Sequence, residues 1–301
     1  MDVKKDTIKD IFKTVAAVLF LSILLTILPV LTLVIAFVLP VPVALLTYRQ
    51  GPRPALTAVV LSALLNGVLL EPRLGLLTVV LFGFSGFIIG GCLREEVSPF
   101  KTLLAAIGAV TISYLIIVLA AHFVLGYNVN DIVSVIENRE AIEEFMGMFP
   151  ELMSEQEEIL TTYREILRTV IPSLLLASAA FTGIINYFVS TWYIKQREED
   201  IETYKPMRFW TFPRLLIIMG ILLSFLFRGN VFFDNVNVIM SFFLFLQGIC
   251  TGLFYLKHRD SLLLRWLLIV LVIFFPYLLI LLGLGDLIFD LRKLRQKQKN
   301  G

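Results

Sequence analysis

Apolar residues follow one another along this chain in long runs that short polar turns interrupt. The first run, residues 15–48, is longer than one membrane crossing needs, because an α-helix rises about 1.5 Å per residue and a hydrocarbon core is about 30 Å thick. Proline removes a backbone donor and clashes inside a helix, so we expect Pro29 to divide this run. The pattern therefore predicts two helices here, with the second bent at Pro40 and Pro42.

Further apolar runs predict further helices, over residues 55–70, 74–92, 102–125, 170–194, 213–227, 236–256 and 262–289. Backbone groups in hydrocarbon must pair internally, and long apolar runs without strand alternation favour helices over a barrel. The predicted fold class is an all-α membrane protein, a polytopic helical bundle of eight or nine hydrophobic spans. The number depends on the last run, because a break at Phe275 and Pro276 would turn it into a re-entrant pair.

One long hydrophilic stretch, residues 126–168, carries ten acidic residues against three arginines. Apolar residues recur in it at helical spacing on both sides of Pro150, which predicts two amphipathic helices. A segment of this size cannot bury a core of its own. We therefore expect it to cover the outer ends of the spans as an extracellular, lid-like insert.

Basic residues are distributed unevenly between alternate connectors, and this predicts the orientation. With a cytoplasmic N-terminus, the inner connectors hold sixteen Lys and Arg residues and the outer ones hold five, as the positive-inside rule requires. Five more lie in the tail, residues 292–299, and nine full spans would place them outside. A re-entrant pair, or an earlier span that fails to cross, would return the tail to the cytoplasm, and we favour a cytoplasmic tail.

The predicted organisation has three parts. A six-span bundle covers residues 1–194 and includes the insert 126–168, a cytoplasmic connector covers residues 195–214, and residues 215–301 form the C-terminal spans and the basic tail. Composition supports a membrane location, since mean hydropathy is +0.86 and only 17% of residues are charged, against about 25% in soluble domains. The lipid bilayer is therefore the first predicted partner.

Several function classes lack their motifs. The chain has no Gly-x-x-x-x-Gly-Lys phosphate loop, no His-Glu-x-x-His and no Gly-x-Ser-x-Gly. Cys92 and Cys250 lie in or beside apolar runs and form no metal pattern, and basic residues are not gathered on a face for nucleic acid. The sequence thus predicts no enzyme, no metal site, no cofactor and no nucleic-acid partner.

Polar residues in or near the spans are the candidate sites, because uncompensated polar groups in a bilayer are costly. The candidate ligand-binding residues are Asn66, Glu71, Arg73, His122, Asn186 and Gln247. For the amides the alternative is a hydrogen bond to a neighbouring helix that only holds the bundle together. For His122, and for the pair that flanks Pro72, the alternative is a solvated group at the membrane border.

Small residues four apart permit close helix approach, and the helix-packing candidates are Gly86 with Gly90 and Gly248 with Gly252. Packing within the chain and docking of a partner protein both fit this pattern. Asp286 and Asp290, one helical turn apart, form another polar pair. We expect Asp290 to pair with the basic tail rather than to take part in acid/base chemistry.

Four segments together resemble one family: Tyr-Arg-Gln-Gly at 48–51, Phe-Trp-Thr-Phe-Pro-Arg at 209–214, Gln-Gly-Ile-Cys-Thr-Gly at 247–252, and Gly-Leu-Gly-Asp-Leu-Ile-Phe-Asp-Leu-Arg-Lys at 283–293. On these segments the chain resembles the YybS-like bacterial polytopic membrane proteins, a family of unknown function. Its first half is similar to the S components of energy-coupling-factor transporters. The resemblance implies a multi-pass protein of the bacterial cell membrane.

The same resemblance implies a function and partners. S components capture a small solute near the outer face and depend on a membrane coupler and ATPases. Members of the resembled family tend to be encoded beside a membrane-bound cyclic-dinucleotide phosphodiesterase, which is a second implied partner. The leading hypothesis is an S-component-like protein that binds or transports a small solute from the outer face, and the alternative is a scaffold or regulatory protein that holds partner proteins.

Overall fold

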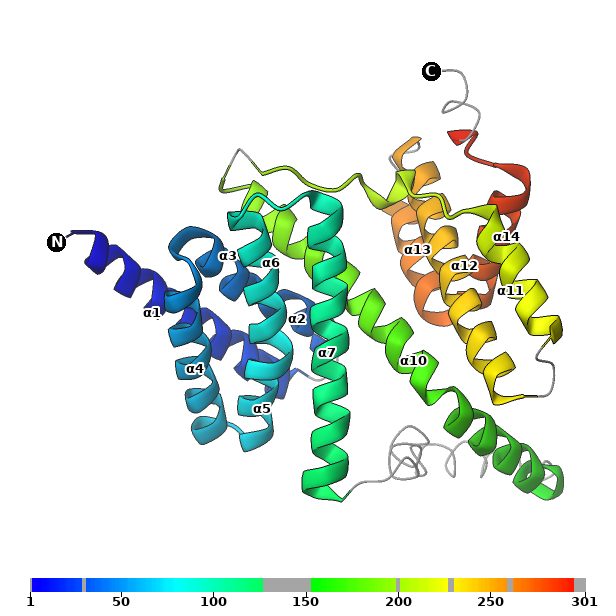
Figure 1. Cartoon of the computed structure of the whole chain (residues 1–301), viewed down its shortest axis with the longest axis horizontal. Helices are drawn as coiled ribbons and strands as arrows, with labels where there is room; N and C mark the ends of the chain where they lie inside the picture. Colours follow the sequence, from blue (N-terminus) through cyan, green and yellow to red (C-terminus); the bar gives the residue numbers. More distant parts are fainter. Residues whose placement is uncertain are drawn as a thin grey trace. The chain divides into compact units, whose positions relative to one another are not determined.

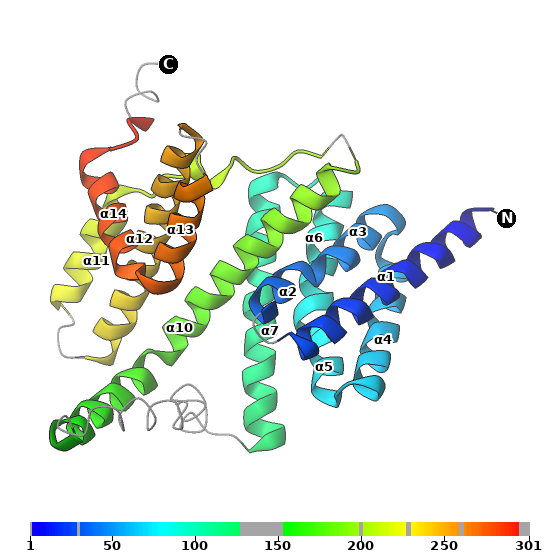
Figure 2. The same cartoon turned by 180° about the vertical axis from the view of Figure 1, so that it is seen from behind.

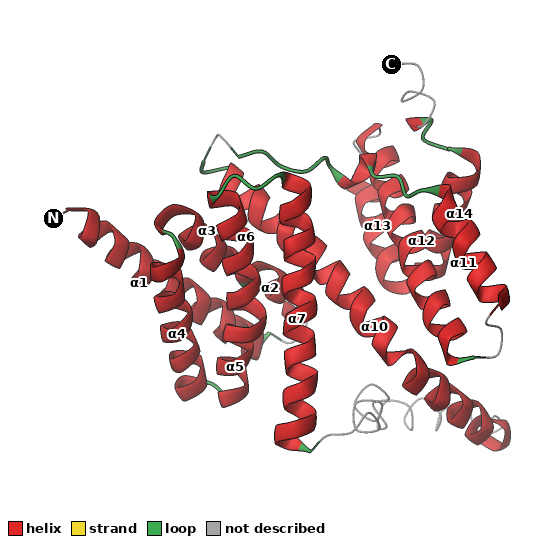
Figure 3. Cartoon of the chain, in the orientation of Figure 1, coloured by secondary structure: helices red, strands yellow, loops and turns green. Residues whose placement is uncertain are grey.

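The computed structural model describes residues 2–28, 31–126, 153–198, 201–226, 230–258 and 262–294. Over these residues the chain forms helices joined by turns, without a strand (Figure 3), so the predicted all-α class is confirmed. Six helices are long and apolar enough to cross a membrane: Lys5–Ile27, Pro52–Leu69, Pro72–Arg94, Pro99–Phe123, Glu165–Lys195 and Val231–Lys257. The expected eight or nine spans are not confirmed, because other apolar runs form shorter or broken helices in the described part of the chain.

Contacts divide the chain into two compact units. The amino-terminal unit comprises Met1–Tyr127 and Ser178–Tyr204, and the carboxy-terminal unit comprises Asn128–Ala177 and Lys205–Gly301. One helix, α10 (Met153–Lys195), belongs partly to each.

The amino-terminal unit is an antiparallel bundle (Figures 1 and 2). Besides the end of α10, its elements are α1 (Asp2–Ile27), α2 (Thr32–Val38), α3 (Pro40–Gln50), α4 (Pro52–Leu69), α5 (Pro72–Leu77), the π-helix η2 (Thr78–Gly83), α6 (Phe84–Arg94) and α7 (Pro99–Leu125). Proline begins α3, α4, α5 and α7, where its missing N–H costs nothing and its fixed φ suits the first turn. The expected bend at Pro40 is thus a break between α2 and α3, whereas Pro29 lies outside the described residues.

The π-helix η2 widens the third long helix of the bundle at Thr78–Gly83. Hydroxyl groups cover its carbonyl oxygens: Ser113 donates to the oxygen of Val80, and Ser85 donates to that of Leu81 at 2.7 Å. Such satisfaction by side chains is what lets an irregular helix persist in an apolar bundle.

Close helix contacts in this unit occur at glycines. A Cβ on Gly86 would lie 2.4 Å from the oxygen of Pro40, and one on Gly90 would lie 2.3 Å from the oxygen of Ala44. Both glycines therefore lie against α3, within the chain.

The carboxy-terminal unit contains the start of α10, the short 3-10 helix η4 (Met207–Phe209), α11 (Arg214–Leu226), α12 (Val231–His258), α13 (Leu262–Phe274) and α14 (Pro276–Phe289). Figures 1 and 2 show α11 beside α12 and running the other way, and a Cβ on Gly220 would lie 2.5 Å from Met240. The last apolar run breaks at Phe275–Pro276, where α13 and α14 meet at 107°.

Helices α12 and α14 lie side by side and parallel. A Cβ on Gly248 would lie 2.0 Å from the oxygen of Leu279, and one on Gly283 would lie 2.0 Å from the oxygen of Leu244. Each glycine thus meets the residue four positions before the other glycine. Parallel helices produce this arrangement, because each Cβ points toward the N-terminus of its own helix. Gly252 instead contacts Leu268 of α13.

The hydrophilic stretch differs in part from its prediction. Residues 127–152, which include the first expected amphipathic helix, lie outside the described residues. From Met153 onward the chain is a single helix that continues into the predicted span and keeps Pro172 inside it, so the second expected amphipathic helix and the span form one unbroken helix. Asn235 of α12 supports this region, since its Nδ2 donates to the oxygen of Thr169 at 2.8 Å and its Oδ1 accepts from the N–H of Ser173 at 3.3 Å.

Candidate functional site

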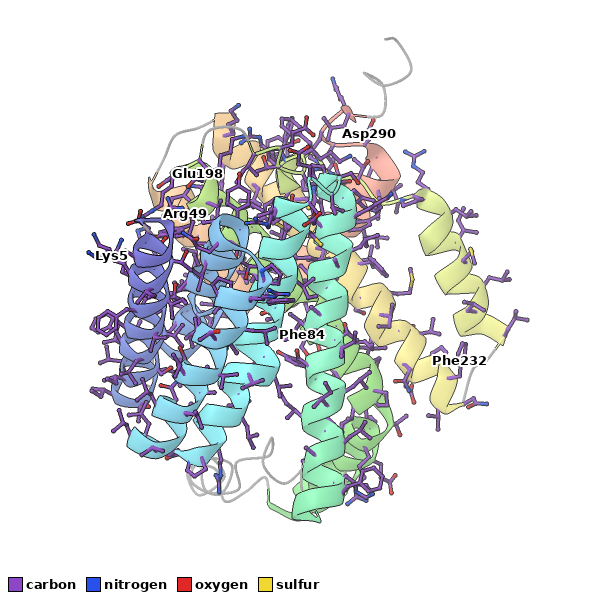
Figure 4. All side chains as sticks on the ribbon, turned by 60° about the vertical axis from the view of Figure 1, so that its left-hand side comes forward. Lys5, Arg49, Phe84, Glu198, Phe232 and Asp290 are labelled. Carbon is purple, nitrogen blue, oxygen red and sulfur yellow. The ribbon has the colours of Figure 1, made fainter. Side chains whose placement is uncertain are left out.

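The polar end of the amino-terminal unit is where the start of α1 and the ends of α3, α6 and α10 come together. Gln50 donates to the Asp10 carboxylate at 2.9 Å, and Arg49 Nε donates to Glu198 Oε1 at 2.7 Å. In Figure 4, Lys5, Arg49 and Glu198 lie at this end. Connectors far apart in sequence therefore share one charged end of the bundle.

Arg94 fixes the corner between α3 and α4. Its Nη1 donates to the backbone carbonyl oxygens of Tyr48 and Arg49 at 3.0 and 3.1 Å. At the end of α3, these oxygens would otherwise lack a hydrogen-bond donor. The chain then turns at Gly51, whose φ of +89° disfavours any residue with a side chain. This corner belongs to the Tyr-Arg-Gln-Gly segment at residues 48–51.

The segment after α10 also folds back onto this end. The Tyr204 N–H donates to the Tyr187 hydroxyl at 2.8 Å, and the Tyr204 ring lies 5.5 Å from that of Phe100. Ile201 is buried. The first residues of the predicted connector are therefore part of the bundle.

A cavity of about 460 Å³ opens at this polar end between α1, α3 and α10. Its charged and interfacial lining consists of Asp10, Lys13, Arg49, Trp192, Tyr193 and Arg197, and its apolar lining includes Phe20, Leu21, Val38, Val41 and Leu45. The volume is in the range of small-molecule sites, about 300–1,000 Å³. We call it the α1–α10 cavity.

A second cavity of about 470 Å³ lies beside Arg94. It is lined by Tyr48, Glu96 and Glu202 as well as Arg94 and Ile201. Glu96 has a φ of +52°, a conformation that is uncommon outside glycine. Its lining mixes these polar side chains with the apolar Leu93, Val97, Pro99 and Ile201, and it lacks the long apolar wall of the α1–α10 cavity.

Asn66, a predicted ligand-binding residue, connects three helices. Its Nδ2 donates to the hydroxyls of Ser22 and Thr78, both at 2.8 Å. Thr78 uses its own proton on the oxygen of Leu74, so it must accept from Asn66, and this determines the orientation of the amide. Asn66 Oδ1 is buried and has no partner in the described part of the chain.

The predicted residues Glu71, Arg73 and His122 lie at the other end of the unit. Glu71 is exposed in the turn between α4 and α5, and Arg73 is exposed in the first turn of α5. The Glu71 N–H donates to the oxygen of Asn66 at 3.0 Å. His122 is exposed in the last turn of α7, with its ring edge-on to Phe123. None of the three lines either cavity described above.

The two remaining candidates, Asn186 and Gln247, belong to different units. Asn186 is buried in α10, and its Oδ1 has no partner among the described residues. Gln247 lies in the carboxy-terminal unit, where its Oε1 accepts from the N–H of Phe212 at 3.1 Å and its Nε2 donates to Asp286. The structure therefore does not gather the six predicted residues into one site, and their contact with a ligand stays a prediction.

Gln247 belongs to a buried polar cluster in the carboxy-terminal unit, made with Asp286 and Arg292. Arg292 donates to Asp286 Oδ2 through Nε at 3.1 Å and through Nη2 at 2.8 Å, and it also donates to the oxygens of Arg208 and Trp210. Sequence analysis missed Arg292, because it assigned the basic tail to Asp290. No local spacing rule pairs residues six apart, so the sequence carried no signal for this pairing.

Among the described residues, no group of three or more His, Cys, Asp or Glu side chains is arranged to hold an ion.

Comparisons with known proteins identify the family of the chain but not a function. No curated protein matches it, and no solved structure matches it. The similarity to S components therefore remains a hypothesis. Residues 14–287 match the family described as Predicted membrane protein (DUF2232), so the chain belongs to this family of predicted integral membrane proteins.

Proposed function

We propose that this multi-pass membrane protein binds a small amphipathic molecule in the α1–α10 cavity. The observation that carries the proposal is the division of the cavity lining, with charged side chains at the polar end of the bundle and a continuous apolar wall below them. Ligand sites in proteins are mostly apolar and contain a few placed polar groups. The S-component-like hypothesis likewise requires a solute site in the first six helices.

This proposal moves the expected site to the other end of the bundle. The sequence favoured the outer mouth beneath the insert, but the α1–α10 cavity lies beside Lys13, Arg49 and Arg197, which the positive-inside rule assigns to the cytoplasmic side. Capture from the cytoplasm, or from the inner leaflet, follows from this assignment. Transport is not required by the geometry, so the proposal is limited to binding.

The topology that we propose keeps the connector and the C-terminal tail on the same side. Arg292 donates to the oxygens of Arg208 and Trp210 in the connector, and α12 and α14 both end toward it. α13 and α14 have 13 and 14 residues, which gives about 20 Å each, less than the roughly 30 Å of hydrocarbon. The pair therefore forms a re-entrant hairpin, and both chain termini are cytoplasmic.

A cavity-filling variant tests the binding proposal. Ala17 lines the cavity, whereas its neighbour Ala16 is exposed on another face of α1 and does not. We expect native mass spectrometry to find a retained molecule, or thermal unfolding to find a stabilising compound in a metabolite and lipid panel. Ala17→Phe should abolish the effect and Ala16→Phe should preserve it. A ligand effect that survives Ala17→Phe, or no bound molecule with any compound, would contradict the proposal.

The scaffold hypothesis has less support from the described residues. Its expected docking faces were the connector 195–214 and the small-residue pairs. Of these pairs, Gly86 and Gly90 are covered by α3, and Gly248 and Gly252 are covered by α14 and α13. A partner that docks on these glycines would first have to displace a helix of the same chain. We therefore rank ligand binding above a scaffold role.

A further inference from the structure

The charges at the mouth of the α1–α10 cavity indicate which chemical class of amphiphile it takes. This step rests on the function proposed above, because it concerns the same cavity. Three cations, Lys13, Arg49 and Arg197, line the cavity. Among the described residues, two carboxylates, Asp10 and Glu198, accompany them, and these five groups together have a formal excess of one positive charge.

Both carboxylates already form ion pairs with two of the three cations. Arg49 is paired with Glu198 at 2.7 Å, and Lys13 lies 3.5 Å from Asp10, which also accepts from Gln50. In the described part of the chain, Arg197 has no carboxylate within 4.0 Å, and its guanidinium instead lies 4.7 Å from the centre of the Tyr193 ring. Arg197 is therefore the cation whose charge a ligand can complement.

The position of Arg197 suits the head of a membrane amphiphile. It follows Trp192 and Tyr193, which also line the cavity, and such aromatic side chains favour the level of lipid headgroups. The apolar wall continues from this level along α1 and α3, through Phe20, Leu21 and Val41. A guanidinium prefers phosphate and carboxylate oxygens, which it can contact with two parallel hydrogen bonds.

We infer that the α1–α10 cavity binds an amphiphile that has a phosphate or carboxylate head and one apolar chain, with the head on Arg197 and the chain along α1 and α3. A neutral head on the same chain would leave the Arg197 charge uncompensated, and in a phosphocholine head the choline cation offsets the negative charge of the phosphate. A head without a chain would leave the apolar wall in contact with water. Both parts of the molecule are therefore needed for binding.

The test compares four probes on the full chain in nanodiscs of zwitterionic lipid. They are lysophosphatidic acid, lysophosphatidylcholine and monoacylglycerol with one common chain, and glycerol phosphate without a chain. We expect lysophosphatidic acid to bind at least about tenfold more tightly than the other three, the factor that one hydrogen bond to a charged group typically supplies. A fatty acid of the same chain length would test the carboxylate head, with the same expectation.

Two variants assign the effect to the proposed residue. Arg197→Gln should remove the preference for the anionic head. Arg197→Lys should retain part of this preference, because the positive charge remains but the two parallel hydrogen bonds of the guanidinium are lost. Lys195→Gln is the matched control, since Lys195 is exposed two residues away and does not line the cavity. Equal loss in Lys195→Gln and Arg197→Gln would show nonspecific attraction to surface charge and would overturn the inference.

The failures of this inference and of the proposed function can be told apart. If all three single-chain lipids bind equally and Ala17→Phe abolishes their binding, the cavity is a ligand site without head selectivity, and only the inference fails. If no probe responds to Ala17→Phe, and the broader panel gives no cavity-dependent ligand, the proposed function fails with it.

Discussion

Arg292 and Asp286 form an ion pair at 2.8 Å in which the two side chains are 0% and 3% exposed. The two residues are six apart, because α14 ends at Phe289 and the left-handed Asp290, with a φ of 49°, turns the chain back. Arg292 then reaches both Asp286 and the connector oxygens of Arg208 and Trp210. One buried guanidinium thus joins the end of α14 to a segment more than eighty residues earlier.

Asp286→Asn should destabilise the carboxy-terminal unit by about 3–5 kcal/mol, because it leaves the buried Arg292 cation without a counter-charge. Thermal unfolding of the protein in detergent, followed by circular dichroism, measures the loss. Glu95→Gln is the control, since Glu95 is exposed and should change stability by less than about 0.5 kcal/mol. Equal stability of the two variants would show that the ion pair is not formed.

Removing both charges should restore only part of the stability. Replacing a buried ion pair by hydrophobic residues is often neutral, but here Asp286→Leu with Arg292→Leu also leaves the oxygens of Arg208 and Trp210 without their donor. Each unpaired buried group costs about 1–3 kcal/mol. The double variant should therefore unfold between the wild type and Asp286→Asn in the same thermal assay.

Gly283→Ala should destabilise the contact between α12 and α14, because the added Cβ would lie 2.0 Å from the backbone oxygen of Leu244. Overpacking of this kind costs about 1–3 kcal/mol and sometimes more. Gly285→Ala, two residues along the same helix, meets nothing nearer than a Leu291 methyl group at 3.8 Å, so it should be neutral or slightly stabilising. A lower melting temperature for Gly285→Ala than for Gly283→Ala would contradict the close contact between α12 and α14 at Gly283.

The sequence predicted the helices where a local rule was sufficient. Apolar runs identified the helical class, and the backbone chemistry of proline placed the break at Pro40 and anticipated the one at Pro276. The continuity of α10 was not predicted, because the sequence was divided near residue 169 at a change from polar to apolar composition. Backbone hydrogen bonds do not depend on that change, and α10 continues through it.

The α1–α10 cavity and the buried cluster around Arg292 depend on contacts between residues that are distant in the sequence or separated by a turn. Rules based on local sequence patterns do not predict such contacts. Helical spacing pairs residues three or four apart, so it could not connect Asp286 with Arg292 across a left-handed turn. Arg49 and Glu198 are 149 positions apart, and their pairing follows only from the way the helices assemble. The candidate amides show the same limit, since Gln247 serves the buried cluster while Asn66 holds three helices together.

A labelling experiment should place Lys195 and Lys293 on the same side of the membrane. In a background with Cys92→Ser and Cys250→Ala, single cysteines at these two exposed positions should both react with a membrane-impermeant maleimide only after the cells are opened. Tyr277→Cys, at the tip of the α13–α14 hairpin, should react poorly from both sides, because a re-entrant tip lies in hydrocarbon. Reaction of Lys293→Cys in intact cells would show that the last run crosses the membrane.

Asn235→Ala should weaken α10 beside Pro172. Proline removes the N–H that would pair with the oxygen of Arg168 and crowds that carbonyl, and the Asn235 amide contacts the next pair of backbone groups, Thr169 and Ser173. Loss of both hydrogen bonds should cost about 1–3 kcal/mol in thermal unfolding. Asn235→Asp should cost less than Asn235→Ala, since its carboxylate still accepts from Ser173.

The double variant tests whether Asn235 compensates for the proline. Pro172→Ala restores a backbone donor and lets the helix close its own hydrogen-bond ladder, so the effect of Asn235→Ala should be smaller in that background by about 0.5–3 kcal/mol, the usual coupling between residues in contact. An additive pair of substitutions would mean that Asn235 stabilises α12 and α10 independently of the proline. The coupling energy thus separates support of the proline-containing helix from ordinary packing between α10 and α12.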